Sequence, residues 1–190
     1  LDEWRTSDHS RSPAFRLAEG LVAFFRADFE EAVARLDEAR NDERLAAEAK
    51  LFHAHSLARL EKFGEATELL SDLMENSRWQ SAARAILGEI RRRQNRPEEA
   101  LRLLELATDD VGATPITSWR ISHAYAERAL VWQLREGWDD KRVSRNLRRG
   151  RDRGDPKAPD LRLARGLYLM QREKPDVKEA ARELQAVVDV

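Results

Sequence analysis

Apolar residues recur at i, i+3, i+4 and i+7 along most of the chain, which is the spacing that places them on one face of an α-helix. Leu17, Leu21 and Phe24 follow this spacing, and after a short break Val33 and Leu36 continue it. The six prolines lie at predicted helix starts or between helices, so none interrupts an apolar face. The pattern predicts ten helices, near residues 13–26, 29–40, 44–60, 63–75, 79–94, 97–107, 118–136, 139–149, 160–173 and 176–189.

The same pattern repeats with a step of 34 residues. A Glu-Ala dipeptide, a small residue in the first helix and a large aliphatic residue in the second recur in register: Glu31-Ala32, Glu65-Ala66 and Glu99-Ala100; Gly20, Ala54 and Gly88; Leu36, Leu70 and Leu104. The small residues let a neighbouring helix backbone approach, so each period is predicted to be a packed helix pair. Such a pair cannot bury its apolar face alone, and successive pairs must therefore stack.

These residues resemble the tetratricopeptide repeat family, of the type found in bacteria. The resemblance is close over residues 13–107 and looser over 118–190, where Gly166, Glu179-Ala180 and Leu184 return to the pattern. It implies an all-α fold, a right-handed α-α superhelix of about five helix pairs. We expect a linker over residues 1–12, three regular repeats over 13–107, a loop over 108–117 and two divergent repeats over 118–190 of the same solenoid domain.

The resemblance also implies a concave groove lined by the first helix of each pair. Its candidate peptide-binding residues are Leu17, Leu21, Phe24, Leu51, His55, Arg59, Glu89, Arg92 and Arg93. This groove would be apolar at one end and cationic at the other, which suits an amphipathic or acidic-hydrophobic peptide. The alternative is that the apolar members are ordinary core between helices and that the arginines form a solvated face.

Charge is distributed unevenly, although 34 basic and 35 acidic side chains nearly cancel. Residues 1–77 carry 10 basic and 17 acidic side chains, whereas residues 78–190 carry 24 and 18. The most basic segment runs from Lys141 to Arg165, and its candidate basic patch is Lys141, Arg142, Arg145, Arg148 and Arg149. Two further hypotheses follow: copies of the chain assemble through the acidic and basic halves, or the basic segment binds an anionic polymer. Nucleic acid is disfavoured because the segment lacks aromatic residues that stack on bases.

Catalytic and metal-binding motifs are missing from the sequence. The absence of cysteine excludes disulfides, thiolate metal sites and a cysteine nucleophile. His53 and His55 are two residues apart on a predicted helix and point to different sides, so they are not expected to form a metal pair. No nucleophile elbow, phosphate-binding glycine loop or zinc-protease helix occurs. We therefore expect no enzyme activity, no metal and no cofactor, and we predict a scaffold or adaptor that binds a peptide or partner protein, with an acidic one among the candidates.

Location and oligomeric state are left open by the sequence. No stretch approaches the roughly 18 apolar residues of a membrane-spanning helix. The chain begins at Leu1 rather than Met, from which we expect a fragment or a processed form. Cytoplasm and periplasm are equally compatible with these features.

Overall fold

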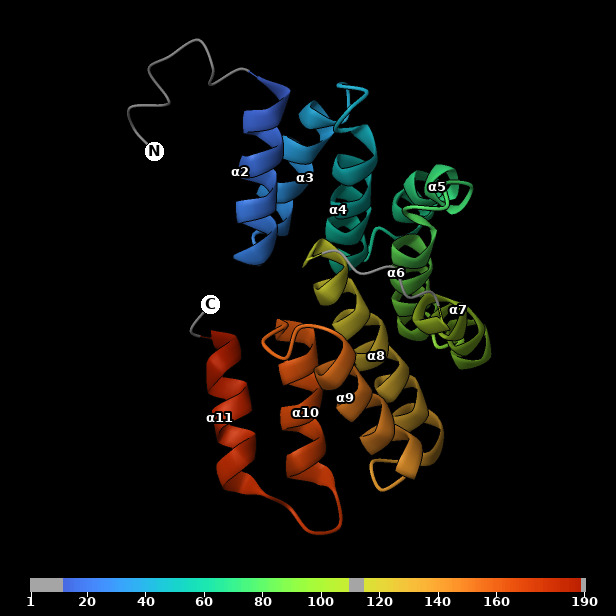
Figure 1. Ribbon diagram of the computed structural model, residues 1–190, viewed down its shortest axis with the longest axis vertical. Helices are drawn as coiled ribbons and strands as arrows, with labels where there is room; N and C mark the ends of the chain where they lie inside the picture. The colour runs from blue at the N-terminus through green and yellow to red at the C-terminus, as the bar shows by residue number, and fades with distance from the viewer. Residues whose placement is uncertain (1–11, 110–114, 189–190) are drawn as a thin grey trace. The chain divides into compact units, whose positions relative to one another are not determined.

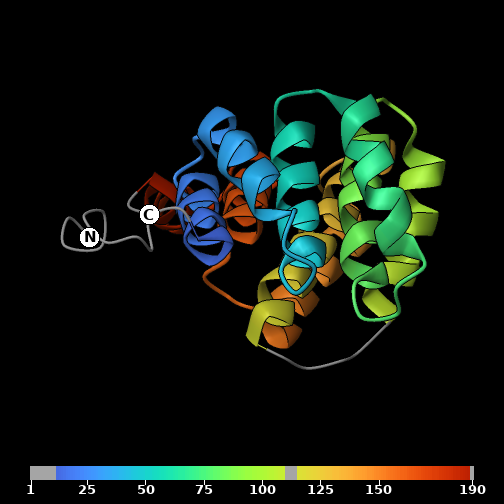
Figure 2. The same cartoon turned by 90° about the horizontal axis from the view of Figure 1, so that it is seen from above.

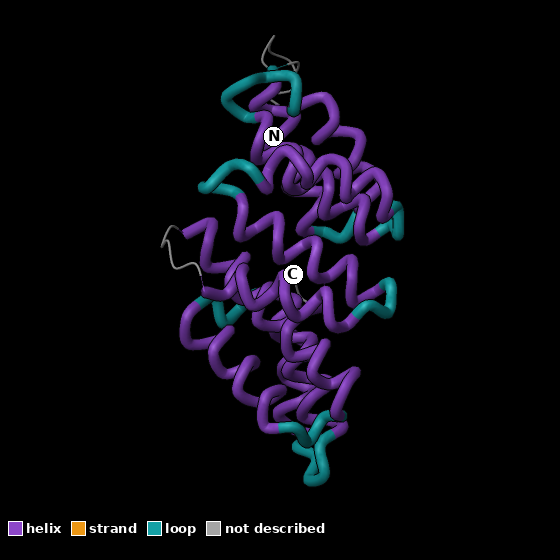
Figure 3. The backbone as a smooth tube through the Cα atoms, turned by 90° about the vertical axis from the view of Figure 1, so that its right-hand side faces the viewer, coloured by secondary structure: helices purple, strands orange, loops and turns teal. Residues whose placement is uncertain are grey.

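The computed structural model describes residues 12–109 and 115–188, and every regular element in these two ranges is an α-helix (Figures 1 and 3). The predicted all-α fold class is confirmed for this part of the chain. None of the described helices combines the length and the apolar composition needed to cross a membrane. The helices are α2 (Pro13–Phe25), α3 (Phe29–Ala39), α4 (Ala46–Arg59), α5 (Phe63–Met74), α6 (Gln80–Arg93), α7 (Pro97–Asp109), α8 (Pro115–Glu136), α9 (Lys141–Arg153), α10 (Pro159–Gln171) and α11 (Val177–Val188).

The chain divides into two compact units, unit 1 (Leu1–Ala83) and unit 2 (Arg84–Val190), with the boundary inside α6. In unit 1, α2 packs on α3, α3 on α4 and α4 on α5 (Figures 1 and 2). In unit 2, α8 packs on α7, α9 and α10, and α10 packs on α11. The predicted grouping into three regular and two divergent repeats within one solenoid domain stays a prediction.

The 34-residue period is visible in the turns inside the helix pairs. Ala27, Glu61 and Asn95 are separated by one period each, and all three adopt a left-handed backbone, with φ of 60°, 63° and 59°. In each turn the next backbone N–H donates to a carbonyl five residues earlier, as from Asp28 to Ala23 at 2.9 Å. This bond satisfies a carbonyl that the helix end would otherwise leave unpaired. In the corresponding turn after α8 the left-handed residue is Gly137, with φ of 87°, where a glycine carries no steric cost.

Close packing of the two helices in a pair depends on the small residue of the first helix. A Cβ added to Gly20 would lie 2.6 Å from Leu36 Cγ, and one added to Gly88 would lie 2.5 Å from Leu104 Cγ. A Cβ added to Gly166 would likewise lie 2.6 Å from Leu184 Cγ. In these three pairs the small residue of the first helix lies directly against the large aliphatic residue of the second. Burying each such leucine contributes about 2 kcal/mol, which these glycines make possible.

Two helix boundaries differ from the predicted ones by three residues or more, and prolines and glycines explain both. Helix α8 begins at Pro115 rather than residue 118, because proline is pre-organised for the first helical position; Pro159 opens α10 in the same way. Helix α9 continues past Gly150 to Arg153, and Gly154 caps it. Gly150 serves close packing instead, since a Cβ there would lie 2.9 Å from Leu161 Cδ1. Residues 110–114 of the predicted loop lie outside the described residues.

Candidate functional site

Three of the predicted apolar groove residues in unit 1 are buried, and one of them packs α2 against α4. Leu17, Phe24 and Leu51 are all buried. The Phe24 ring lies 5.2 Å from the ring of Phe52 and 5.0 Å from that of His55, measured between centroids. These contacts stabilise the interface between two neighbouring helices. A direct role of these side chains in binding a peptide stays a prediction.

The exposed apolar surface of α2 lies beside this packed set. Val22 and Phe25 are 51% and 45% exposed, whereas the predicted groove residue Leu21 is half-buried. Arg59, another predicted groove residue, places its guanidinium 5.6 Å from the centroid of the Phe29 ring. A partner that approaches this side of unit 1 would therefore meet Val22 and Phe25 before it met Phe24.

His53 and His55 contact different helices, as their spacing predicts. His55 packs against Phe24 of α2, whereas His53 faces Asp37 of α3, with its Nδ1 3.9 Å from the carboxylate. Because the two imidazoles point to different helices, they cannot both bind the same metal ion.

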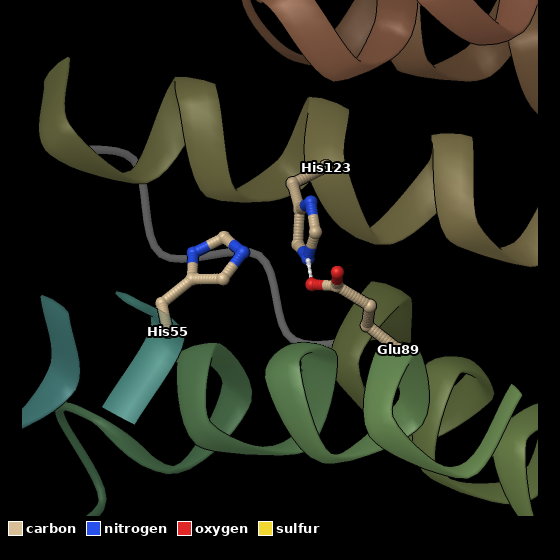
Figure 4. Close-up of side chains that lie close together, drawn as sticks. All are labelled: His55, Glu89 and His123. Atoms are coloured by element: carbon tan, nitrogen blue, oxygen red, sulfur yellow. Dashed lines mark ion pairs between the residues drawn. The ribbon is translucent and has the colours of Figure 1, made fainter. Parts of the chain in front are cut away.

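In unit 2 the predicted groove residues Glu89, Arg92 and Arg93 belong to a buried ion network between α6 and α8. Figure 4 shows the Glu89 carboxylate paired with His123. The carboxylate lies 3.5 Å from His123 Nε2 and 3.8 Å from a terminal nitrogen of Arg93. Arg92 donates two hydrogen bonds to Glu127, at 2.5 and 3.2 Å. The three predicted residues thus hold partners inside unit 2. His55, also drawn in Figure 4, belongs to unit 1.

His123 extends this network to a third helix. Its Nδ1 lies 3.0 Å from the Asp160 carboxylate at the start of α10, so one imidazole connects α6, α8 and α10. Burial lowers the pKa of His123, but the hydrogen bond to Asp160 and the charges of Asp160 and Glu89 outweigh it and raise the pKa to about 9. The imidazole is therefore a buried cation at neutral pH. Burial also raises the pKa of the nearby Glu127, an effect that Arg92 opposes.

The basic patch predicted on residues 141–149 occupies the outer face of α9. Val143, Asn146, Leu147 and Gly150 form the buried face of this helix. On the opposite face lie four exposed cations that form no ion pair with any described residue: Lys141, Arg145, Arg148 and Arg149. We call these four the α9 cationic face. Their spacing of i, i+4, i+7 and i+8 keeps them together over about 12 Å of helix.

Arg142, the fifth predicted member of the patch, is engaged within unit 2. Its guanidinium bonds to both carboxylate oxygens of Asp140, at 2.8 and 2.9 Å, and stacks 3.6 Å from the centroid of the Trp132 ring. The hydrogen bonds from Arg142 lower the pKa of Asp140 to about 2, although burial acts in the opposite direction. Other basic residues of the segment are also held, Arg151 by Asp152 and Arg165 by Glu183. The four residues of the α9 cationic face have no such pairs among the described residues.

Comparison with known proteins gives a distant structural likeness. No family model and no curated protein matches the chain. Among solved structures, it is similar to one described as the crystal structure of MamA protein, with a TM-score of 0.49 and 15% sequence identity over 93% of this chain and 90% of that chain.

Glu127, Asp160 and His123 were not predicted from the sequence as partners of the groove residues. One signal was present, because His123 and Glu127 are four residues apart and share a face of α8 with buried alanines. Two ionisable residues on an apolar helical face must find partners across the interface, since burial without them is costly. The identity of those partners depends on which helices meet, which the period alone does not specify.

Proposed function

We propose that this chain is a non-catalytic protein-interaction module, and that the α9 cationic face is the surface on which it binds an acidic partner. The single observation that carries the proposal is the clustering on one face of α9 of four exposed cations, none of which forms an ion pair with a described residue. Several other arginines of unit 2 are held by carboxylates, as Arg92 is by Glu127 and Arg165 by Glu183. Four neighbouring exposed cations that no carboxylate of the described ranges neutralises favour binding of an anionic group from another molecule.

A helical or extended acidic peptide matches the geometry of this face. Carboxylates at i, i+4 and i+7 of a partner helix would lie opposite cations that have the same spacing on α9. Paired charges of this kind set specificity and association rate more than raw affinity, and salt weakens them. The proposal therefore includes a strong dependence of binding on ionic strength.

The groove candidates form the second part of the proposal. Val22 and Phe25 on α2, next to the predicted residues Leu17, Leu21 and Phe24, offer apolar area for the hydrophobic side chains of the same kind of partner. A partner with apolar side chains would bind them to this surface of unit 1. Stacked helix pairs of the tetratricopeptide type, the family that the sequence resembles, suit such extended contacts.

Charge reversal on α9 tests the proposal. Replacement of Arg145, Arg148 and Arg149 by Glu should weaken binding of a labelled acidic helical peptide about tenfold at low salt, because three attractions become repulsions. Fluorescence anisotropy at two salt concentrations measures the effect. A matched control reverses three scattered exposed cations, Arg26, Arg102 and Lys174, and gives the same net charge. Equal weakening by both variants, or none by the first, would contradict the proposal. Binding of heparin but not of the peptide would identify a polyanion instead.

A second copy of the chain is the alternative partner, favoured by the acidic surface of unit 1. Exposed carboxylates such as Glu30, Glu31 and Glu43 lie in the half that carries the excess of acidic residues. If these carboxylates meet α9 of another copy, light scattering should show oligomers at low salt that dissociate as salt is raised. The α9 triple variant should then be monomeric under the same conditions. A wild-type chain that is monomeric at every salt concentration would exclude this alternative.

A further inference from the structure

A groove of about 800 Å³ opens within unit 1 between α3 and α5, with α4 as its floor. His53 and Leu57 contribute from α4, Asp37 from α3, and Glu65 and Leu69 from α5. The groove thus combines an imidazole with carboxylates from both flanking helices. It shares no residue with the predicted peptide groove or with the α9 cationic face.

His53 lines this groove and carries an unsatisfied polar atom. The residue is only 6% exposed, and its Nδ1 is buried without a hydrogen-bond partner among the described residues. Burial lowers the pKa of His53, and the charge of Asp37 only partly offsets this, so the imidazole is neutral at neutral pH. A neutral imidazole has one nitrogen that accepts a hydrogen bond. A buried polar atom of this kind is costly unless something binds it.

The carboxylates of the groove are only partly compensated. Asp37 pairs with Arg40 at 2.7 Å, and Asp72 pairs with Lys50 at 2.7 Å. Glu65 and the neighbouring Glu68 form no ion pair with other residues in the described ranges. The groove therefore carries an excess of negative charge next to a hydrogen-bond acceptor.

The first helix pair shows what such a set of acceptors binds. There Arg35 lies among three carboxylates, 2.7 Å from Glu31, 3.7 Å from Glu19 and 3.7 Å from Glu38. One period later the three acceptor positions hold Glu65, His53 and Asp72, but the position of Arg35 holds Leu69. The second pair thus has a set of acceptors at these positions and a leucine where the first pair has the guanidinium that binds them.

Two further observations support this equivalence. The ion pair of Arg16 with Glu38, at 2.8 Å, recurs one period later as Lys50 with Asp72, at 2.7 Å. In the third pair the glutamate equivalent to Glu65 is Glu99, which is held by Arg96 and by Arg91, and Arg91 stands where the second pair has Leu57. The glutamate at this position is thus paired with arginine in the first and third repeats, whereas in the second no described arginine pairs with it.

We propose that this groove of unit 1 binds the guanidinium group of an arginine side chain supplied by a basic segment of a partner protein. The planar guanidinium donates several hydrogen bonds in a fixed geometry, so it can reach the carboxylate of Glu65 and the imidazole of His53 together. An ammonium group would satisfy fewer of these acceptors. This inference goes beyond the proposed function, because it concerns a different surface and a ligand of opposite charge.

Short peptides test the proposal on the whole chain. The probes are three acetylated and amidated tripeptides with arginine, lysine or citrulline between two glycines. We expect the arginine peptide to bind with a dissociation constant on the order of 1 mM, and the His53 and Glu65 signals to shift during NMR titration. The lysine peptide should bind several-fold more weakly, and neutral citrulline should not bind. No saturable shift at His53 would overturn the proposal.

Three variants separate this site from other effects. Glu65→Gln removes an exposed charge without changing shape and should weaken arginine binding about tenfold. Leu69→Arg should abolish it, because the chain then supplies the guanidinium itself. The control Glu43→Gln removes an exposed charge of unit 1 outside the groove and should bind normally, as should the α9 triple variant. Thermal melting checks that each variant folds. Equal binding by Glu65→Gln and wild type would overturn the proposal and leave the proposed function of α9 untouched.

Discussion

Replacement of His123 by leucine should lower the free energy of unfolding by about 3–5 kcal/mol at neutral pH, the range expected when one partner of a buried ion pair is removed. The imidazolium of His123 lies between Glu89 and Asp160, and leucine would leave both carboxylates without their shared cation. Urea denaturation followed by circular dichroism measures the change. A loss below about 1 kcal/mol would show that the network contributes little to stability.

The same side chain should make the stability of the wild-type protein fall in alkaline solution. The pKa of His123 is about 9 in the folded chain, against an ordinary value of 6.5. A group whose pKa rises on folding stabilises the folded state fully below its unfolded pKa, and this stabilisation disappears as pH rises through the folded pKa. We therefore expect about 3 kcal/mol to be lost between about pH 6.5 and about pH 9.5.

Variants identify His123 as the source of this pH dependence. The fall of the unfolding free energy between about pH 6.5 and about pH 9.5 should be absent in His123→Leu. The stability of this variant should approach that of the wild type above about pH 9. His53→Gln is the matched control, because His53 is also buried but has a lowered pKa. It should retain the alkaline loss. A wild-type stability that stays constant between about pH 6.5 and about pH 9.5 would show that His123 is neutral in the folded chain.

Replacement of Gly88 by alanine should destabilise the protein by about 1–3 kcal/mol, the usual cost of inserting a methyl group into a packed interface. The new Cβ would lie 2.5 Å from Cγ of Leu104, so α6 and α7 would have to move apart or Leu104 would have to leave its position. Thermal and urea denaturation of the whole chain both measure this loss.

A second glycine provides the control for this prediction. Gly64 lies on α5, and a Cβ added there would meet no described atom within 4 Å, so Gly64→Ala should be neutral or stabilising by up to about 1 kcal/mol through helix propensity. Combining Gly88→Ala with Leu104→Val should recover part of the loss, because the smaller side chain makes room. Equal stability of Gly88→Ala and the wild type would contradict the packing argument. The second repeat accommodates Ala54 at this position, which shows that alanine fits where the helix spacing is set for it.

Much of the fold could be predicted because its signals are local or periodic. A helix pair needs apolar residues at helical spacing and a small residue where its backbones meet, and both requirements recur visibly every 34 residues. The contacts of Gly20 with Leu36 and of Gly88 with Leu104 follow directly from that period. The start of α8 was harder to place, because Pro115 is equally compatible with a loop and with the first turn of a helix.

The candidate sites depended on information that the period does not contain. The arginines of residues 141–165 look alike in the sequence, yet Arg142 is held by Asp140 whereas Arg145 and Arg148 form no ion pair within the described residues. Glu89 and Arg92 are equally compatible, in the sequence, with a groove and with a solvated face. Their partners His123 and Glu127 lie more than 30 residues away, on a helix whose facing side is set by packing.

The sequence by itself determined the all-α class, the paired helices and the positions where two helices must touch, because each of these follows from side-chain size and spacing within one period. The tertiary structure alone decided which charges are neutralised and which remain, because an ion pair depends on the distance between side chains from different helices. Arg92 consequently ties two helices together through its ion pair with Glu127. Arg148 is also an arginine, but it forms no ion pair with any described residue. The tertiary structure also showed that the second repeat keeps the acceptors of the first without its guanidinium, since these acceptors come together only once α3, α4 and α5 are packed.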